Sequence, residues 1–469
     1  MSTITTVAPT AGDAAASTAG RLHRRLLPLY VATFFQGVNL WVPVEKLFMD
    51  EIGFDPASVG LMAAAYAAVV PVLEVPSGIL ADRWSRRGVL MMATAALFVS
   101  NTIGAVSNSV TVYIIGAMFL GVYFAMQSGT LDSVVYDTVV DETGGSERFE
   151  QRIGRVRMIE SAALVSSALA GGLIASVTST RFTYFLTLPF LVVSVVALLA
   201  FREPRLHKAA EPTSLRSHIS TTYRTIVQRD CLLPIITLMV LTSLLLTVLF
   251  EFGPLWLVAV AAPAYLYGPH FAGLTSALGL AGLLAGRLRL ADPARMAGVV
   301  AIMVAATLVL VTVHDAVIVT IAQVVIAMLS VTLGILLTAK LHDAVPSNIR
   351  SGVASGVGTF TWFAFLPFGL IFGQVSKHAG VHAAGWMITG VAVLAGVLLI
   401  RLALRGPRPS PPPSPPPATP GRPAPPSPPP PLPLRPPPER CRISWRIACH
   451  PRGSSDYSSS SLVIDGVAR

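Results

Sequence analysis

The chain has 469 residues, of which 53% are hydrophobic and only 12% are charged, and its mean hydropathy is +0.66. Soluble proteins carry roughly 25% charged residues, so the composition excludes an ordinary soluble protein and indicates a surface that faces lipid. The net charge of +10 could suggest nucleic-acid binding. We reject this because the basic residues lie in short loops between apolar runs, as membrane topology requires. We expect a lipid bilayer as partner and no nucleic acid.

The predicted elements begin after an Ala-, Ser- and Thr-rich N-terminal tail, residues 1–21, which is expected to be disordered. Twelve apolar segments follow, each close to the length of about 20 residues that spans a bilayer. Spanning segments must satisfy their own backbone hydrogen bonds, so all twelve are predicted to be helices. They are 26–44, 58–80, 88–107, 110–131, 158–178, 182–201, 232–250, 265–286, 296–313, 316–339, 352–375 and 381–400.

The orientation of the helices follows from Lys and Arg, which accumulate in cytoplasmic loops. If the N-terminus is cytoplasmic, the cytoplasmic segments before the last helix hold 21 basic residues and the opposite side holds only Lys46, Arg181 and Lys377. This bias predicts an even number of helices with both termini inside. The fold class is therefore an all-α integral membrane protein with 12 helices.

The longest internal loop divides these helices into two sets of six. Residues 22–201 are predicted to form an N-terminal six-helix bundle, 202–231 a basic cytoplasmic linker and 232–405 a C-terminal six-helix bundle. Two equal halves predict a pseudo-symmetric transporter. In the last segment, 406–469, proline dominates, which favours polyproline II or disorder over a packed core.

Several kinds of chemistry have no support in the sequence. The three cysteines, Cys231, Cys441 and Cys449, are too scattered for a disulfide framework or a zinc site, so we expect no metal and no cofactor. The chain contains no Gly-Lys-Ser/Thr phosphate-binding loop. We also find no cluster of nucleophile and base. We therefore expect a protein that is not an enzyme and that uses an ion gradient, most simply protons, or only facilitates transport.

The stretch GILADRWSRRGVL, residues 78–90, lies in the predicted loop between the second and third helices. It resembles the Gly-x-x-x-Asp-Arg-x-(Gly)-Arg-Arg signature of the major facilitator superfamily, a family of twelve-helix transporters. The resemblance covers residues 22–405, and Ser85 replaces the usual glycine. The matching residues are Gly78, Asp82, Arg83, Arg86 and Arg87.

Positive-inside topology explains the arginines of this stretch but not its acid. Asp82 could accept hydrogen bonds from a helix N-terminus, whose dipole favours an anion. The resemblance implies the start of the eleventh helix, Arg350-Ser351-Gly352, as the partner. Such a contact would latch the two halves on the cytoplasmic side. The alternative is an ordinary basic loop with one stray acid.

Ionisable groups within membrane helices are costly and are therefore candidates for function. Glu74 lies about 12 Å inside the second helix from Asp82, at 1.5 Å per residue. It could carry a proton, or it could form a plain interhelical hydrogen bond. The remaining candidates for proton coupling or a gate network are Asp132, Asp137, Arg157, Glu160 and Glu251, for which solvated or interfacial helix ends are the alternative.

Polar and aromatic residues of several helices are candidates for lining a central cavity. They are Gln36, Asn39, Trp41, Gln127 and Trp362. Trp41 could instead lie at the membrane interface, which is the commoner use of tryptophan. The stretch SSALAGGLIA, residues 166–175, keeps the glycines of the superfamily's Gly-Pro-x-x-Gly-Gly antiporter motif but not its Gly-Pro. That departure weakens the argument for antiport.

These observations predict a secondary active transporter that moves a small organic solute by alternating access, with proton-coupled efflux preferred. Uptake by symport or facilitation is the alternative within transport. A membrane scaffold whose proline-rich tail binds a soluble partner is the alternative from another class. We expect a monomer in the cell (plasma or inner) membrane.

Overall fold

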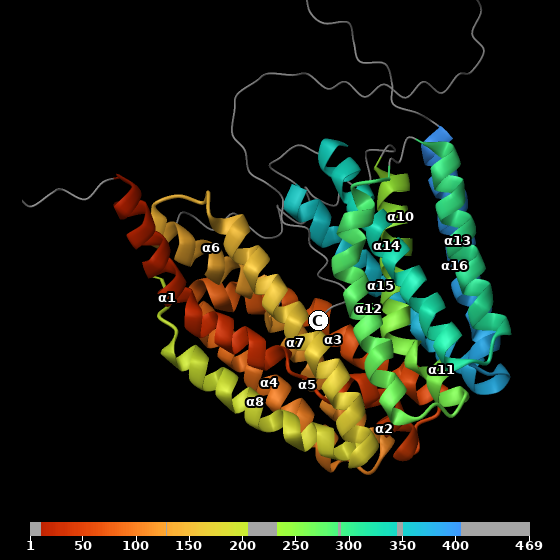
Figure 1. Ribbon diagram of the computed structural model, residues 1–469. Coiled ribbons are helices and arrows are strands. Elements are labelled where there is room, and N and C mark those ends of the chain that lie inside the picture. Colours follow the sequence, from red (N-terminus) through yellow and green to blue (C-terminus); the bar gives the residue numbers. More distant parts are fainter. Residues whose placement is uncertain (1–10, 128, 205–231, 289–291, 345–349, 405–469) are drawn as a thin grey trace, which may run out of the picture.

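The computed structural model describes residues 11–127, 129–204, 232–288, 292–344 and 350–404, which form helices and no strand. The first half is shown from red to yellow in Figure 1 and the second from green to blue. In the first half the helices are α1 Ala11–Gly37, η1 Val42–Val44, α2 Glu45–Glu51, α3 Pro56–Arg83, α4 Arg86–Val106, α5 Val110–Gln127, α6 Thr130–Thr143, α7 Phe149–Val177 and α8 Thr180–Ala200. In the second half they are α10 Leu233–Phe252, α11 Pro254–Ala259, α12 Ala264–Ala285, α13 Pro293–Thr312, α14 Ala316–Ala344, α15 Arg350–Ala379 and α16 Val381–Leu404.

Eleven helical segments in the described part are long and apolar enough to cross a membrane, which makes the chain a multi-pass membrane protein. The eighth predicted segment, 265–286, forms α12 but is not among the eleven. Its 22 residues include several glycines, Pro269 and His270, which lower its hydropathy. Much of the proline-rich tail, the linker and the loop before α15 lies outside the described residues.

Two predictions about the first helix are wrong. Residues 11–21 were expected to belong to a disordered tail, but α1 begins at Ala11. This segment is rich in alanine, the residue that costs least in a helix. The apolar run to residue 44 was expected to be one helix, but α1 ends at Gly37 and the short helix η1 begins at Val42. Pro43, in the first turn of η1, has no backbone N–H with which to continue α-helical bonding.

One other predicted span, in the first half, is also interrupted. The segment 110–131 divides into α5 and α6, and Gly129 between them has a φ of +69°. That backbone conformation strains any residue with a Cβ atom, so glycine is the residue expected there. In the second half, the predicted segment 232–250 forms the continuous helix α10, and the short helix α11 follows from Pro254.

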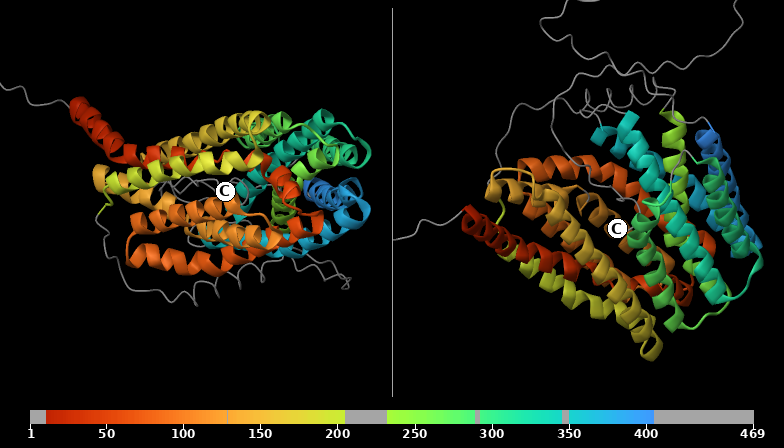
Figure 2. Two further views of the ribbon diagram at one scale, coloured as in Figure 1. Left: turned by 90° about the horizontal axis from the view of Figure 1, so that it is seen from below. Right: turned by 45° about the horizontal axis from the view of Figure 1, so that its top comes forward.

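The two halves meet most closely at one end, which we call the outer end because the charge distribution predicts that it faces outside. It is the end at which α3 begins and α15 ends, near α2 and α11 in Figure 1. Here glycines replace side chains at the helix crossings: a Cβ on Gly60 of α3 would lie 2.7 Å from the carbonyl oxygen of Gly369 of α15. Small residues let membrane helices approach in this way. The second view in Figure 2 shows the halves side by side.

Candidate functional site

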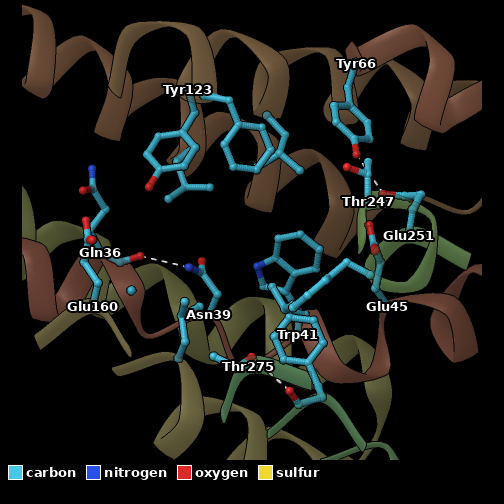
Figure 3. Close-up of a pocket in the computed structure, with 18 of the residues that line it drawn as sticks. Gln36, Asn39, Trp41, Glu45, Tyr66, Tyr123, Glu160, Thr247, Glu251 and Thr275 are labelled. Carbon is cyan, nitrogen blue, oxygen red and sulfur yellow. Dashed lines mark hydrogen bonds between the residues drawn. The ribbon is translucent and has the colours of Figure 1, made fainter. Parts of the chain in front are cut away.

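A cavity of about 170 Å³ lies between the halves, and helices from both contribute to its lining. The first half supplies Gln36, Asn39, Trp41, Glu45, Tyr66, Tyr123, Phe124 and Glu160, among others. The second half supplies Thr247, Phe250, Glu251, Phe271, Thr275 and Trp362, among others. In Figure 3, Tyr123 lies across the view from Trp41, while Glu45, Glu251 and Tyr66 gather at one end and Gln36 and Glu160 at the other.

The break after α1 brings polar groups to this cavity. Asn39 donates a hydrogen bond from Nδ2 to the carbonyl oxygen of Gln36 at 2.9 Å, which satisfies a backbone group that the broken helix leaves open. The break packs on α7, where a Cβ on Gly171 would lie 2.0 Å from the carbonyl oxygen of Leu40. Non-helical backbone at membrane depth is tolerated where it is buried in protein or lines a cavity.

Gln36 connects three helices by hydrogen bonds. Its Nε2 donates to Thr94 Oγ1 of α4 at 2.9 Å, and its Oε1 accepts from Gln127 Nε2 of α5 at 3.0 Å. Gln127 supports the cavity through Gln36 and is not itself part of the lining. The remaining predicted cavity residues, Asn39, Trp41 and Trp362, do line it.

A buried lysine and two glutamates close the outer end of the cavity. Lys46 Nζ lies 2.8 Å from Glu45 Oε2 and 2.5 Å from Glu251 Oε1, and only 1% of the lysine side chain is exposed. The second oxygen of each carboxylate accepts from a tyrosine: Glu45 Oε1 from Tyr113 at 3.0 Å, and Glu251 Oε2 from Tyr66 at 2.8 Å. We call these five residues the outer charge cluster. Ion pairs and hydrogen bonds together offset the cost of burying three charges.

Aromatic rings support this cluster from the first half. Tyr113 and Tyr184 share a hydrogen bond of 2.7 Å, and Trp41 stacks on Tyr184 with ring centroids 5.0 Å apart. Phe48 also packs against both tyrosines. The rings hold Tyr113, and through it Glu45, in one place.

Comparison with known proteins identifies the architecture that holds this cavity. Residues 26–370 match the family model described as Major Facilitator Superfamily. The chain belongs to this superfamily. It is therefore a member of a class of membrane transporters, as the loop signature implied.

The sequence relatives of this superfamily member match only part of its length. The nitrite extrusion protein of Bacillus subtilis is 29% identical over 106 residues, which are 23% of this chain and 27% of the relative. The quinolone resistance protein NorA of Staphylococcus aureus strain Mu50 is 20% identical over 186 residues, which are 39% of this chain and 47% of the relative. The chain thus covers less than half of the length of these two relatives.

Solved structures share the fold over most of the chain. The nucleoside transporter NupG has a TM-score of 0.67 at 12% identity, with 81% of this chain and 98% of that chain covered. A bacterial homologue of the human lysosomal transporter Spinster, solved inward-facing and unoccupied, has a TM-score of 0.66 at 13% identity, with 84% and 99% covered. The D-xylose–proton symporter has a TM-score of 0.61 at 12% identity, with 80% and 96% covered. At these identities the likeness is one of fold.

The superfamily signature lies at the opposite, inner end of the first half. Arg86 forms an ion pair with Asp137 of α6 and donates to the carbonyl oxygen of Ser133 at 2.9 Å. Arg87 donates to the carbonyl oxygen of Phe201 at 3.0 Å, and Arg83 is the last residue of α3. Ser85 caps α4 by accepting from the backbone of Gly88 at 2.9 Å, so this departure from the signature still serves the turn.

The proposed latch between the halves falls on side chains that the structure does not describe. Asp82 belongs to α3, and Arg350, Ser351 and Gly352 begin α15, but their side chains lie outside the described residues. Gly78 was expected to allow a close helix approach. Among the described atoms, a Cβ at this position would meet nothing within 4 Å, so the expected approach is absent there.

The acids of α6 hold arginines from three other helices at the inner end. Asp132 accepts from Arg157 of α7 at 2.8 Å, Asp137 pairs with Arg86 of α4, and Asp141 lies 2.7 Å from Arg25 of α1. Arg157 also pairs with Glu160 at 3.1 Å, and Glu160 reaches the cavity. The structure therefore joins Asp132, Arg157 and Glu160 in one network and places Asp137 in another contact.

Two predicted candidates lie far apart in the fold. Glu74 lies within α3, and its carbonyl oxygen accepts from Ser77 Oγ at 3.0 Å. Glu251 belongs to the outer charge cluster. Sequence reasoning treated Lys46 as an outer loop residue and missed Glu45 and the tyrosines. The adjacent pair Glu45-Lys46, at the end of a long apolar run, was the signal that could have found them.

Proposed function

We propose that the chain exports an amphipathic organic cation in exchange for protons, by alternating access of the cavity to the two sides of the membrane. The main support for this proposal is the cavity between the halves, whose lining combines carboxylates with aromatic rings. Among the described lining residues there is no lysine or arginine. A cation gains both from carboxylates and from the faces of aromatic rings.

The charge balance around the cavity supports this choice of solute. At the outer end, Glu45 and Glu251 share the single cation Lys46. At the other end, Asp132 and Glu160 share Arg157. If its three charged groups are ionised, the outer charge cluster carries one excess negative charge, and Glu160 adds a carboxylate to the lining at the other end. A positively charged solute of modest size would be attracted between them.

The names of two relatives that match part of the chain support export as the direction of transport. One is named for nitrite extrusion and the other for quinolone resistance. Nitrite is an anion, and the acidic lining argues against an anion as the solute here. The D-xylose–proton symporter and the nucleoside transporter share the fold, so uptake by symport or facilitation is the competing direction. We place the protein in the cell membrane as a monomer.

Transport in inside-out membrane vesicles tests the proposal. With a proton gradient acid inside, vesicles containing the protein should accumulate a fluorescent lipophilic cation such as ethidium, and a protonophore should abolish the accumulation. A neutral aromatic solute of similar size should not accumulate. Accumulation only in right-side-out vesicles would favour uptake, and no gradient-dependent movement would contradict proton coupling. Deleting residues 406–469 should leave transport intact, whereas a scaffold would lose its function.

A further inference from the structure

The outer charge cluster is divided unequally between the two halves. Lys46 and Glu45 belong to α2, Tyr113 to α5 and Tyr66 to α3, all in the first half. Glu251 alone comes from the second half, at the end of α10. Both hydrogen-bond donors of its carboxylate, Lys46 at 2.5 Å and Tyr66 at 2.8 Å, therefore reach it across the interface between the halves.

Separating the halves at the outer end would affect the charged groups differently. Lys46 keeps Glu45 as its ion-pair partner, and Glu45 keeps Tyr113, because these contacts lie within the first half. Glu251 loses both of its donors. An ionised carboxylate left without partners at membrane depth is costly, and a bound proton removes that cost.

We propose that the outer end opens when Glu251 takes up one proton, because Lys46 then has Glu45 as its remaining ion-pair partner. We call Glu45 the fallback partner of Lys46. Lys46 is the positioning residue: it holds Glu251 when the outer end is closed and forms a neutral pair with Glu45 when it is open. This inference rests on the proposed proton-coupled function. It names Glu251 as the proton site and couples proton uptake there to opening of the outer end. The proton enters from outside when the outer end opens and leaves when Glu251 returns to Lys46.

Glu251 is the carboxylate of this cluster whose described donors both lie across the interface, whereas Glu45 keeps its partners within the first half. The titratable and charged groups in the described surroundings are Glu45 and Lys46 of α2 and Tyr66 of α3, with Tyr113 and Tyr184 behind Glu45. The second half contributes Thr275 of α12, Trp362 of α15 and Gln323 of α14, which bonds the nearby carbonyl oxygen of Gly253, and none of these titrates. His270 of α12 has Thr320, not Glu251, as its hydrogen-bond partner.

The experiment measures opening of the outer end directly, without any solute. Spin labels at Ser109, an exposed residue of the first half, and Ala379, an exposed residue at the end of α15, report the separation of the halves. Distances are measured in lipid nanodiscs between about pH 5 and pH 8, the range in which a coupling carboxylate must act. The three native cysteines are replaced beforehand. We expect the outer-open population to rise as the pH falls.

Four substitutions distinguish this mechanism from a purely structural ion pair. Glu251→Gln should favour the open state and remove its pH dependence. Lys46→Gln should raise the outer-open population at the alkaline end of the range by about tenfold, which corresponds to one pK unit. Glu45→Gln should lower that population, because Lys46 then has Glu251 as its only ion-pair partner. Tyr66→Phe, which keeps the ring, should act like Lys46→Gln with a smaller effect.

The opposite signs of the Glu45 and Lys46 variants are the decisive result. If Glu45→Gln opens the outer end as Lys46→Gln does, Glu45 is not the fallback partner and the inference is wrong. Persistent pH dependence in Glu251→Gln would place the proton elsewhere and also overturn it. Cation export without pH-driven opening would reject this inference and keep the proposed function. Opening driven by pH without cation export would keep this inference and reject the proposed function.

Discussion

Gly172 of α7 lies directly against the backbone of Gly268 of α12, and a Cβ on Gly172 would be 2.7 Å from the Gly268 nitrogen. This contact joins the two halves at the outer end. We therefore expect Gly172→Ala to hold them apart and to reduce transport by roughly five- to a hundredfold, because overpacking costs about 1–3 kcal/mol. Gly298→Ala in α13 is the control, since its Cβ would meet nothing within 4 Å. Equal transport by both variants would contradict tight outer closure.

The diglycine also shows how far the sequence could be interpreted alone. Apolar length and loop charge predicted the helices and their division into halves, because the bilayer imposes those constraints on every span. Gly171 and Gly172 could be recognised as packing positions, but not as contacts to the break after α1 and to α12. Lys46 looked like a loop residue, since its partner Glu251 lies 205 residues away in the sequence. Long-range pairing of charges has no periodic pattern in the chain.

The inner end of the first half depends on α6. Asp137→Asn should lower the Tm of the purified protein by weakening its ion pair with Arg86, whose side chain is only 16% exposed. A partly buried pair of this kind contributes on the order of 1 kcal/mol, and an exposed one less. Asp292→Asn is the matched control, because its partner Arg295 is 57% exposed. A loss of Tm that is as large in the control would argue against a special contribution of α6.

Asp82 gives a prediction that concerns the loop signature. We expect Asp82→Asn to impair transport while membrane insertion and orientation survive, because the arginines alone determine the topology of the loop. Transport in vesicles and the accessibility of loop cysteines measure the two properties separately. Normal transport by this variant would leave the loop with a topological function only and reject the latch.

A second ion pair between the halves should not contribute to pH dependence. Lys377 Nζ lies 2.8 Å from Asp55 Oδ2 at the outer end. The hydrogen bond from Lys377, with that from the Ser58 backbone, lowers the pKa of Asp55 from 3.8 to about 2. Since the folded-state pKa of Asp55 is depressed, the contribution of this ion pair to stability is complete above about pH 4. It is lost only as the pH falls through about 2.

Asp55→Asn should therefore weaken outer closure by a similar factor at every pH between about 5 and 8. The rate of transport falls, but the shape of its pH profile stays that of the parent protein. Glu251→Gln, measured beside it, should flatten the profile. A shifted midpoint in Asp55→Asn would show that this carboxylate, and not Glu251 alone, exchanges protons in the working range.

Trp362 provides a test of the charge of the solute. It lines the cavity beside Tyr66, with ring centroids 6.3 Å apart. Trp362→Leu should weaken binding of a lipophilic cation by about two- to thirtyfold, because cation–π contacts contribute about 0.5–2 kcal/mol. Binding of a neutral solute of the same shape should change much less. Trp386→Leu removes a tryptophan that is 57% exposed on α16 and should leave the affinity for the cation unchanged. Fluorescence titration of the purified protein measures all of these affinities. Equal weakening of cation and neutral solute in Trp362→Leu would mean that the ring acts only by packing, and the cationic solute would lose this support.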